Sequence, residues 1–373
     1  MKTLRNSLYL LLCLVMGIMA CNDDDRDPLV VPTAYDGTNF NTNAATQLGV
    51  RQSLTNLVDE MKKGRTAGVI VPASILNNLY NQSGTPSLVS VTAPYYAGRV
   101  NWTDGFLQEL SNASGTGYTP GNPIGQGGTY GGYLFDENGL EMEQMVEKGL
   151  FGALLYHHFN QLAKGTITEA TVDQMVAIFG AHPDFANSYQ ANLHANPDVF
   201  SANYAARRDK NDGNGYYTRI RDQFIKLQAA VRAGNDYNTE RDEAIAEIRS
   251  LWEKSNAATV INYCHSTISR LSATNPTDAD KAAALHAYGE SVGFVHGWRT
   301  VDDKTISDAQ IEEILVLLNA PYNSTPTSYL FVTDAVNQLP KLTQVISKLT
   351  DIYGFSAAEV EDFKQNWVSA QNR

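Results

Sequence analysis

Residues 140–164 read LEMEQMVEKGLFGALLYHHFNQLAK and form the strongest helical pattern in the chain. At about 100° per residue, Glu141, Gln144, Lys148 and Gly152 fall along one stripe of this helix, and most other positions are apolar. A polar stripe on an otherwise apolar helix indicates a buried polar network of Glu141, Gln144 and Lys148, because buried polar groups usually satisfy one another. Contact with a ligand is the alternative.

Two glycines interrupt the same helix. Gly149 and Gly152 each lower helix stability by about 1 kcal/mol relative to alanine. We therefore predict that another helix approaches closely there. His157 and His158 follow, but adjacent side chains point in different directions on a helix, so a shared ligand is not expected. A helix C-terminus also favours a histidine cation, so their interpretation is structural.

Helical patterning extends over most of the chain. Several segments begin with capping residues, of which Ser356-Ala-Ala-Glu359 is a capping box. Strand-like alternation is scarce, so we predict an all-α fold of antiparallel helical bundles. Further helices are predicted over 47–63, 73–80, 168–180, 202–233, 239–272, 278–299, 307–318, 328–350 and 356–370.

Residues 83–133 are rich in Gly, Ser, Thr and Asn. This composition predicts a long Gly-rich loop that lies structured over the helices. The glycines have neither the dinucleotide-binding spacing nor the Gly-Lys-Ser/Thr ending of a phosphate-binding loop.

The N-terminus predicts export and lipidation. Lys2 and Arg5 precede an apolar run over 8–19, which is shorter than the roughly 20 residues that span a bilayer. The run ends in Ile-Met-Ala-Cys21, which resembles a lipobox. We expect residues 1–20 to be a signal peptide and Cys21 to carry the lipid that holds the protein at the membrane.

The acidic run at 22–25 keeps the segment after Cys21 solvated and resembles a surface-export signal of some lipoproteins. We expect an outer-membrane lipoprotein on the cell surface or the periplasmic face. Residues 21–45 are predicted to be the lipidated cysteine and a polar tether. Residues 46–373 are predicted to be the helical domain, either one bundle or two fused bundles with a break near 182–202 or 234–238.

Composition narrows the functional classes. The net charge is −12 without a basic stretch, which argues against nucleic-acid binding. The 43% hydrophobic content is enough for a sizeable core.

After removal of the signal peptide and lipidation of Cys21, Cys264 has no cysteine partner. Its apolar helical surroundings indicate an inert buried thiol.

His286 and Glu290 form the most informative pair. They share one face of a predicted helix, so they are able to hydrogen-bond or to bind one cation together. A metal site needs further ligands from another helix, for which the candidates are Glu141, Glu169 and Asp173. The alternative is a His–Glu pair that holds core helices together.

Catalytic motifs are missing from the sequence. The chain contains neither His-Glu-x-x-His nor Gly-x-Ser-x-Gly, and no Ser/His/Asp set is assignable.

Short islands of the sequence resemble the lipoprotein domain-of-unknown-function family forty-eight fifty-six, which is related to imelysin-like proteins. The resemblance implies an imelysin-like helical bundle, localisation as a membrane-anchored lipoprotein, and a gene neighbourhood linked to iron or haem acquisition. His286 and Glu290 match family positions. The islands, in order along the chain, are Gly139–Gln144, Lys148–Ala153, Trp252, Ala257–Tyr263, His286–Phe294 and Tyr353–Phe355.

The chain departs from the family in one motif, Glu-His-x-Trp-Asp-Glu-Ala-Phe-Gly. Glu169 and Asp173 match it, whereas Ala170, Val172 and Gln174 replace its His, Trp and Glu. The loss of a histidine and a carboxylate weakens metal binding there and weakens a peptidase interpretation further.

Together these features predict a non-enzymatic binding lipoprotein associated with iron, haem or metal acquisition. Its expected partners are the membrane, through the lipid, and outer-membrane uptake proteins; its expected cofactor is a divalent metal or iron. One alternative is an imelysin-type metal-dependent peptidase, which needs at least three converging ligands. The other is a structural or adhesive surface module that uses 83–133 as its contact surface.

Overall fold

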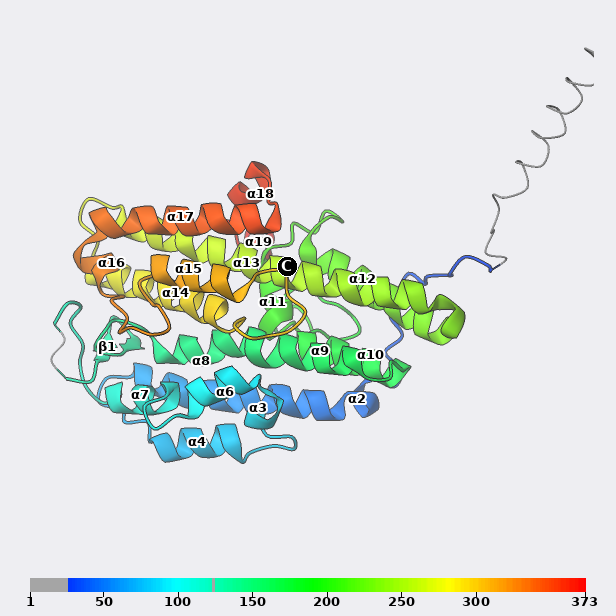
Figure 1. Ribbon diagram of the computed structural model, residues 1–373, viewed down its shortest axis with the longest axis horizontal. Coiled ribbons are helices and arrows are strands. Elements are labelled where there is room, and N and C mark those ends of the chain that lie inside the picture. Colours follow the sequence, from blue (N-terminus) through cyan, green and yellow to red (C-terminus); the bar gives the residue numbers. More distant parts are fainter. Residues whose placement is uncertain (1–25, 123–124) are drawn as a thin grey trace, which may run out of the picture.

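The computed structural model describes residues 26–122 and 125–373 and confirms the all-α prediction (Figure 1). A small hairpin is the only sheet among these residues. The predicted signal peptide, Cys21 and the acidic run lie outside the described residues. Within the described part, no helix combines the length and apolar character that crossing a membrane requires.

The elements fall into three stretches of the chain. The first contains α2 (Phe40–Asn43), α3 (Ala45–Lys62), α4 (Ala73–Asn81), α5 (Leu88–Val91), α6 (Pro94–Asn101), α7 (Phe106–Ala113) and the antiparallel strands β1 (Gly128–Tyr130) and β2 (Tyr133–Phe135). The second contains α8 (Met142–Leu150), α9 (His157–Lys164), α10 (Glu169–Phe179), α11 (Phe200–Arg207) and α12 (Tyr216–Ala233). The third contains α13 (Asn238–Leu271), α14 (Asp278–His296), α15 (Asp308–Leu317), α16 (Leu330–Thr333), α17 (Ala335–Tyr353), α18 (Ala357–Asp362) and α19 (Trp367–Gln371).

The helices pack around α13 and α14. The long helix α13 contacts α11, α12, α14 and α17, while α14 also runs along α8. In Figure 1, α8 to α10 form a middle layer between α2–α7 below and the C-terminal helices above. The buried apolar side chains form one connected cluster that extends from Tyr35 to Val368.

Residues 142–164 form one continuous helical rod, and Glu141, which was predicted to lie on the helix, is the extended residue that precedes it. A π-helical segment, Phe151–Tyr156, joins α8 directly to α9. Such segments are rare, and they occur frequently at functional sites. The rod therefore follows the prediction in length and differs from it in its central turn.

Glycines allow α8 and α14 to touch backbone to backbone. A Cβ atom at Gly293 would lie 2.4 Å from the carbonyl oxygen of Gln144, and one at Gly297 would lie 2.1 Å from that of Gly149. A Cβ at Gly152 would in turn lie 2.8 Å from the Gly297 oxygen. The close helix approach is thus confirmed at Gly152, where α14 is the helix that approaches. At Gly149, the side chain of Tyr96 of α6 occupies the space instead, because a Cβ there would lie 1.7 Å from the Tyr96 hydroxyl oxygen.

The prediction of one long loop over 83–133 is wrong for 88–113, where α5, α6 and α7 form. Leu88, Tyr96, Val100 and Leu110 are buried in the core, and their burial stabilises short helices that the polar composition conceals. The Gly-rich remainder carries the β1–β2 hairpin.

Three predicted helices are divided in the structure. The helix predicted over 202–233 breaks between α11 and α12, because the Asp209 carboxylate accepts hydrogen bonds from the backbone N–H groups of Asn211 and Thr218. Residues 328–350 split at Asp334 into α16 and α17, and 356–370 split into α18 and α19. Asx-type side-chain bonds of this kind compete with helical backbone bonds.

Other boundaries follow their sequence signals. Thr168, Ser307 and Ser356 all cap their helices as predicted, and Ser356 forms a capping box with Glu359. The packed body begins earlier than residue 46, since Tyr35 and Phe40 are already buried.

We predict that Gly293→Ala destabilises the protein by about 1–3 kcal/mol, because the new methyl group overpacks the α8–α14 contact. Urea unfolding followed by circular dichroism measures this. The matched control is Gly49→Ala on the exposed side of α3, where a Cβ meets nothing within 4 Å. There the same substitution should stabilise by up to about 1 kcal/mol. Equal effects at both positions would contradict the close approach.

Candidate functional site

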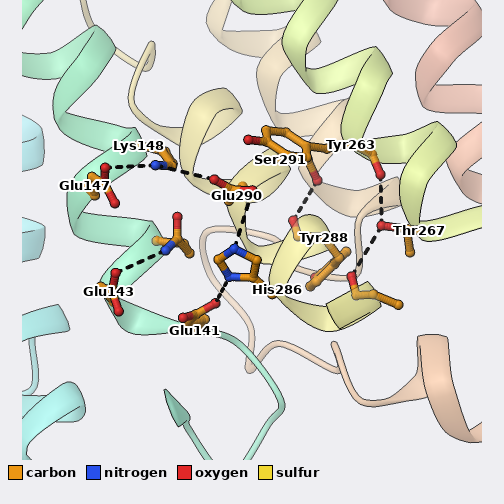
Figure 2. Close-up of polar contacts among 12 residues, drawn as sticks. Glu141, Glu143, Glu147, Lys148, Tyr263, Thr267, His286, Tyr288, Glu290 and Ser291 are labelled. Atoms are coloured by element: carbon orange, nitrogen blue, oxygen red, sulfur yellow. Dashed lines mark hydrogen bonds and ion pairs between the residues drawn. The ribbon is translucent and has the colours of Figure 1, made fainter. Parts of the chain in front are cut away.

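A solvent-open cleft of about 630 Å³ lies where α3, α8, α11 and α14 come together. His286 and Glu290 of α14 line it, and so does Lys148 of α8. The glycine contact between α8 and α14 determines this arrangement, because it brings the polar stripe of α8 against these α14 residues (Figure 2). The cleft is therefore the candidate functional site.

His286 is held by a buried carboxylate. Its Nδ1 donates a hydrogen bond of 2.6 Å to Oε2 of Glu141, which directly precedes α8 and is fully buried. Burial lowers the pKa of His286, but the charge and hydrogen bond of Glu141 outweigh burial and raise that pKa above its ordinary value. Carboxylate–histidine pairs of this kind fix the ring orientation and its tautomer.

Glu290 faces the other ring nitrogen of His286. Its Oε2 lies 3.7 Å from Nε2, one helical turn along α14. The second oxygen, Oε1, accepts a hydrogen bond of 3.1 Å from the Tyr204 hydroxyl and lies 3.4 Å from Nζ of Lys148. Tyr204 and Lys148 thus engage one carboxylate oxygen, while Oε2 faces His286 Nε2, and both residues line the cleft.

Lys148 is buried and forms two ion pairs. Its Nζ lies 2.9 Å from Glu147, in addition to its contact with Glu290. Burial lowers the pKa of Lys148, but the charges of Glu147 and Glu290 and the nearby Tyr204 hydroxyl outweigh it and raise that pKa well above its usual range. For Glu147, burial is outweighed by Lys148 and Lys62, and its pKa is lowered.

Arg65 compensates the negative charge of two buried carboxylates, Glu141 and Glu143. Its guanidinium makes two hydrogen bonds to Glu143, of 2.6 and 2.9 Å, and lies 3.1 Å from Glu141. Burial and the neighbouring Glu141 charge raise the pKa of Glu143 to about 8, although Arg65 opposes this.

The β1–β2 hairpin covers His286. The Tyr133 ring stacks on the imidazole with centroids 4.3 Å apart, and the Arg65 guanidinium lies over Tyr133. Tyr130 and Gly131 hold the hairpin against α14: the Tyr130 hydroxyl donates to Asp278, and a Cβ at Gly131 would lie 2.3 Å from that of Ala282. The Gly-rich segment thus restrains the His286 ring through Tyr133, although none of its described residues lines the cleft itself.

The predicted polar network exists, but its bonds run to other groups than expected. Glu141, Gln144 and Lys148 are all buried, as predicted. Gln144 donates to Glu143 at 3.3 Å, while Glu141 and Lys148 pair with residues of other elements.

The predicted metal set of His286, Glu290, Glu141 and Asp173 is not assembled. Asp173 accepts hydrogen bonds from Tyr35 and Asn43 instead, and so attaches α10 to the N-terminal segment. In the described ranges, no group of three or more His, Cys, Asp or Glu side chains is placed to hold a metal ion. Sequence spacing brought His286 and Glu290 together, whereas the partner of Asp173 depends on packing between distant segments.

The remaining histidines and the free cysteine do not contribute. His157 and His158 are absent from the cleft lining, and burial lowers the pKa of His158 to about 4. Cys264 is buried, and burial raises the pKa of its thiol to about 12, which agrees with an inert thiol.

Sequence reasoning missed several cleft residues. Arg65 and Tyr204 carry no local signal of their role. Gly289, Gly293 and Gly297 repeat every four residues, and this spacing on a helix was the available signal that α14 packs closely on a second helix and carries His286 into the contact.

We predict that Glu141→Gln lowers the pKa of His286, because burial continues to disfavour the imidazolium while its counter-charge is lost. The ring C–H resonances followed by NMR titration report this pKa directly. Glu313→Gln, which removes a carboxylate from an exposed pair with Lys348, should leave the titration unchanged. An unchanged His286 pKa in the Glu141 variant would contradict the pairing.

We also predict a pH-dependent contribution of His286 to stability. A raised pKa in the folded state means that this contribution is fully present below the unfolded value of about 6.5 and is lost as pH rises through the folded pKa. The difference in unfolding free energy between wild type and His286→Gln should therefore be constant below about pH 6.5 and shrink above it, by at most about 1.4 kcal/mol per pH unit. The same comparison in a Glu141→Gln background should lose this trend. A difference that grows with pH would contradict the assignment.

The comparisons with known proteins identify the family of the chain. Searches among curated proteins and among solved structures give no significant match. A family model described as a domain of unknown function (DUF4856) matches residues 100–324, more than half of the chain. The matched region contains the hairpin, α8, α13 and α14, and hence most of the cleft. The chain therefore belongs to the DUF4856 family of domains of unknown function.

Proposed function

We propose that this chain is a non-enzymatic binding protein that holds a charged small ligand in the cleft, in the service of iron or metal acquisition. The observation that carries the proposal is the pair of donors, His286 Nε2 and Glu290 Oε2, which lie 3.7 Å apart and face a cleft of about 630 Å³. A cleft of this size accommodates a small molecule.

The donor count favours a chelated metal over a bare ion. A protein-built metal site supplies at least three ligands, whereas Glu141 engages Nδ1 of His286 and Lys148 and Tyr204 engage one oxygen of Glu290. Arg65 and Lys148 also offset the local negative charge that attracts a bare cation. A metal that arrives with its own chelator needs few further donors from the protein.

A peptidase function has less support. It requires three converging ligands and an open position for water, and the described residues offer no such group. Neither a serine nor a cysteine lines the cleft in the part of the chain that the structure describes.

The cellular placement completes the proposal. Cys21 would anchor the protein to the outer membrane through its lipid, as the sequence suggests. The bound complex would then pass to an outer-membrane uptake protein. Mass spectrometry of the protein from a native-like membrane fraction tests lipidation at Cys21.

We predict that Fe(III) nitrilotriacetate stabilises the 22–373 body against thermal unfolding, by about 2.7 kcal/mol at a hundredfold excess over its dissociation constant. The shift should disappear in a His286→Gln, Glu290→Gln double variant. His182→Gln is the matched control, because it removes a histidine from a surface pair with Asp184 outside the cleft. If the metal complex does not stabilise the wild type, or stabilises the double variant equally, the proposal that the cleft binds a metal complex is wrong.

A further inference from the structure

A partly buried arginine of the cleft forms no ion pair with a carboxylate among the described residues, although the charge of Glu290 acts on it at longer range. Arg207 of α11 lines the cleft, and Nε of its guanidinium donates to Asn203 at 2.9 Å. Its terminal nitrogens have neither an ion pair nor a hydrogen bond among the described residues. Arg65 and Lys148, in the same cleft, are each paired with two carboxylates.

Two tyrosine rings hold the Arg207 guanidinium in place. Its Cζ lies 4.8 Å from the ring centroid of Tyr189 and 4.4 Å from that of Tyr204. Such cation–π contacts stabilise the cation and restrict its rotamers, but they leave the terminal N–H groups without acceptors. Leaving a partly buried charge unpaired is unfavourable, so a counter-ion from outside the protein would complete the site.

We propose that Arg207 is the anchor for an oxyanion, a carboxylate or a phosphate, on the ligand of this cleft. Its planar fork of N–H donors matches these groups bidentately, and the stacked tyrosines fix the fork before the ligand arrives. This inference rests on the proposed function for the location of the ligand, and it adds the chemical class that the ligand must have.

Tyr204 connects the two ends of the cleft. Its hydroxyl donates to Glu290, and its ring contacts both Arg207 and Lys148. A ligand that reaches from Arg207 to His286 therefore carries an oxyanion at one end and a metal-binding group at the other. A metal polycarboxylate chelate with a free carboxylate has this form.

The test is calorimetric titration of the metal-free 22–373 body with citrate and, separately, with inorganic phosphate at about 0.15 M ionic strength. We expect saturable binding of at least one probe, and the probe that binds identifies the oxyanion as carboxylate or phosphate. Arg207→Gln should weaken this binding at least about tenfold, the loss expected for a charged hydrogen-bond partner. Arg207→Lys, which preserves most of the packing, should bind with intermediate affinity because an ammonium lacks the bidentate fork.

Arg219→Gln on α12 is the matched control, since it removes the same charge from an exposed pair with Glu247 of α13. The affinity of this variant for the probe should stay within about twofold of wild type, because salt at this ionic strength screens the effect of remote surface charges on binding. No saturable binding of either probe, or equal affinities of wild type and the folded Arg207 variants, would overturn the inference.

Failure here is distinct from failure of the proposed function. The oxyanion titration uses no metal and depends on Arg207, whereas the melting experiment uses a metal complex and depends on His286 and Glu290. Loss of the metal-dependent shift with intact citrate binding would reject the metal proposal alone. An intact metal-dependent shift together with oxyanion binding that is absent or independent of Arg207 would reject the role of Arg207 alone.

Discussion

The backbone contact between α8 and α14 is the constraint on which the cleft depends. Because Gly293 and Gly297 lack side chains, the two helices approach until carbonyl oxygens of α8 occupy the space that Cβ atoms would fill. At this separation, side chains on both helices reach one another directly, and His286 contacts Glu141 while Glu290 contacts Lys148. A larger side chain at the contact would move these charged groups apart and leave them buried without partners, which is strongly unfavourable.

The buried charges are arranged in two compensated groups. Arg65 pairs with Glu141 and Glu143, and Lys148 pairs with Glu147 and Glu290. His286 lies between the groups and is the residue whose protonation couples them. The π-helical segment begins at Phe151, directly beyond Lys148, so the irregular turn of the long rod also borders the cleft. Irregular helical geometry at a polar cleft fits a functional role for the cleft more readily than a structural one.

The cleft is asymmetric in a way that suggests how a ligand is oriented. At the His286 end the charges are paired and the Tyr133 ring restrains the imidazole. At Arg207 the guanidinium is restrained by aromatic rings, but its terminal nitrogens have no acceptor within the ranges 26–122 and 125–373. A ligand with one anionic end complements this distribution in a single orientation.

Much of the fold was predictable from local patterns. Periodicity over 140–164, the capping residues Thr168, Ser307 and Ser356, and the scarcity of alternation sufficed for an all-α fold, because helix formation depends on neighbours along the chain. The pairing of His286 with Glu290 followed likewise from their spacing on one helix. The helices α5 to α7 were missed, since burial in the tertiary structure, and not composition, stabilises them.

What the sequence by itself determined is therefore the helical class and which residues share a helix face. Only the tertiary structure decided which faces meet. The contacts of His286 with Glu141 and of Asp173 with Tyr35 join elements far apart in the chain, and no local pattern encodes such contacts. The physical reason is that periodicity fixes the direction of a side chain relative to its own helix axis, whereas its partner depends on how the helices pack.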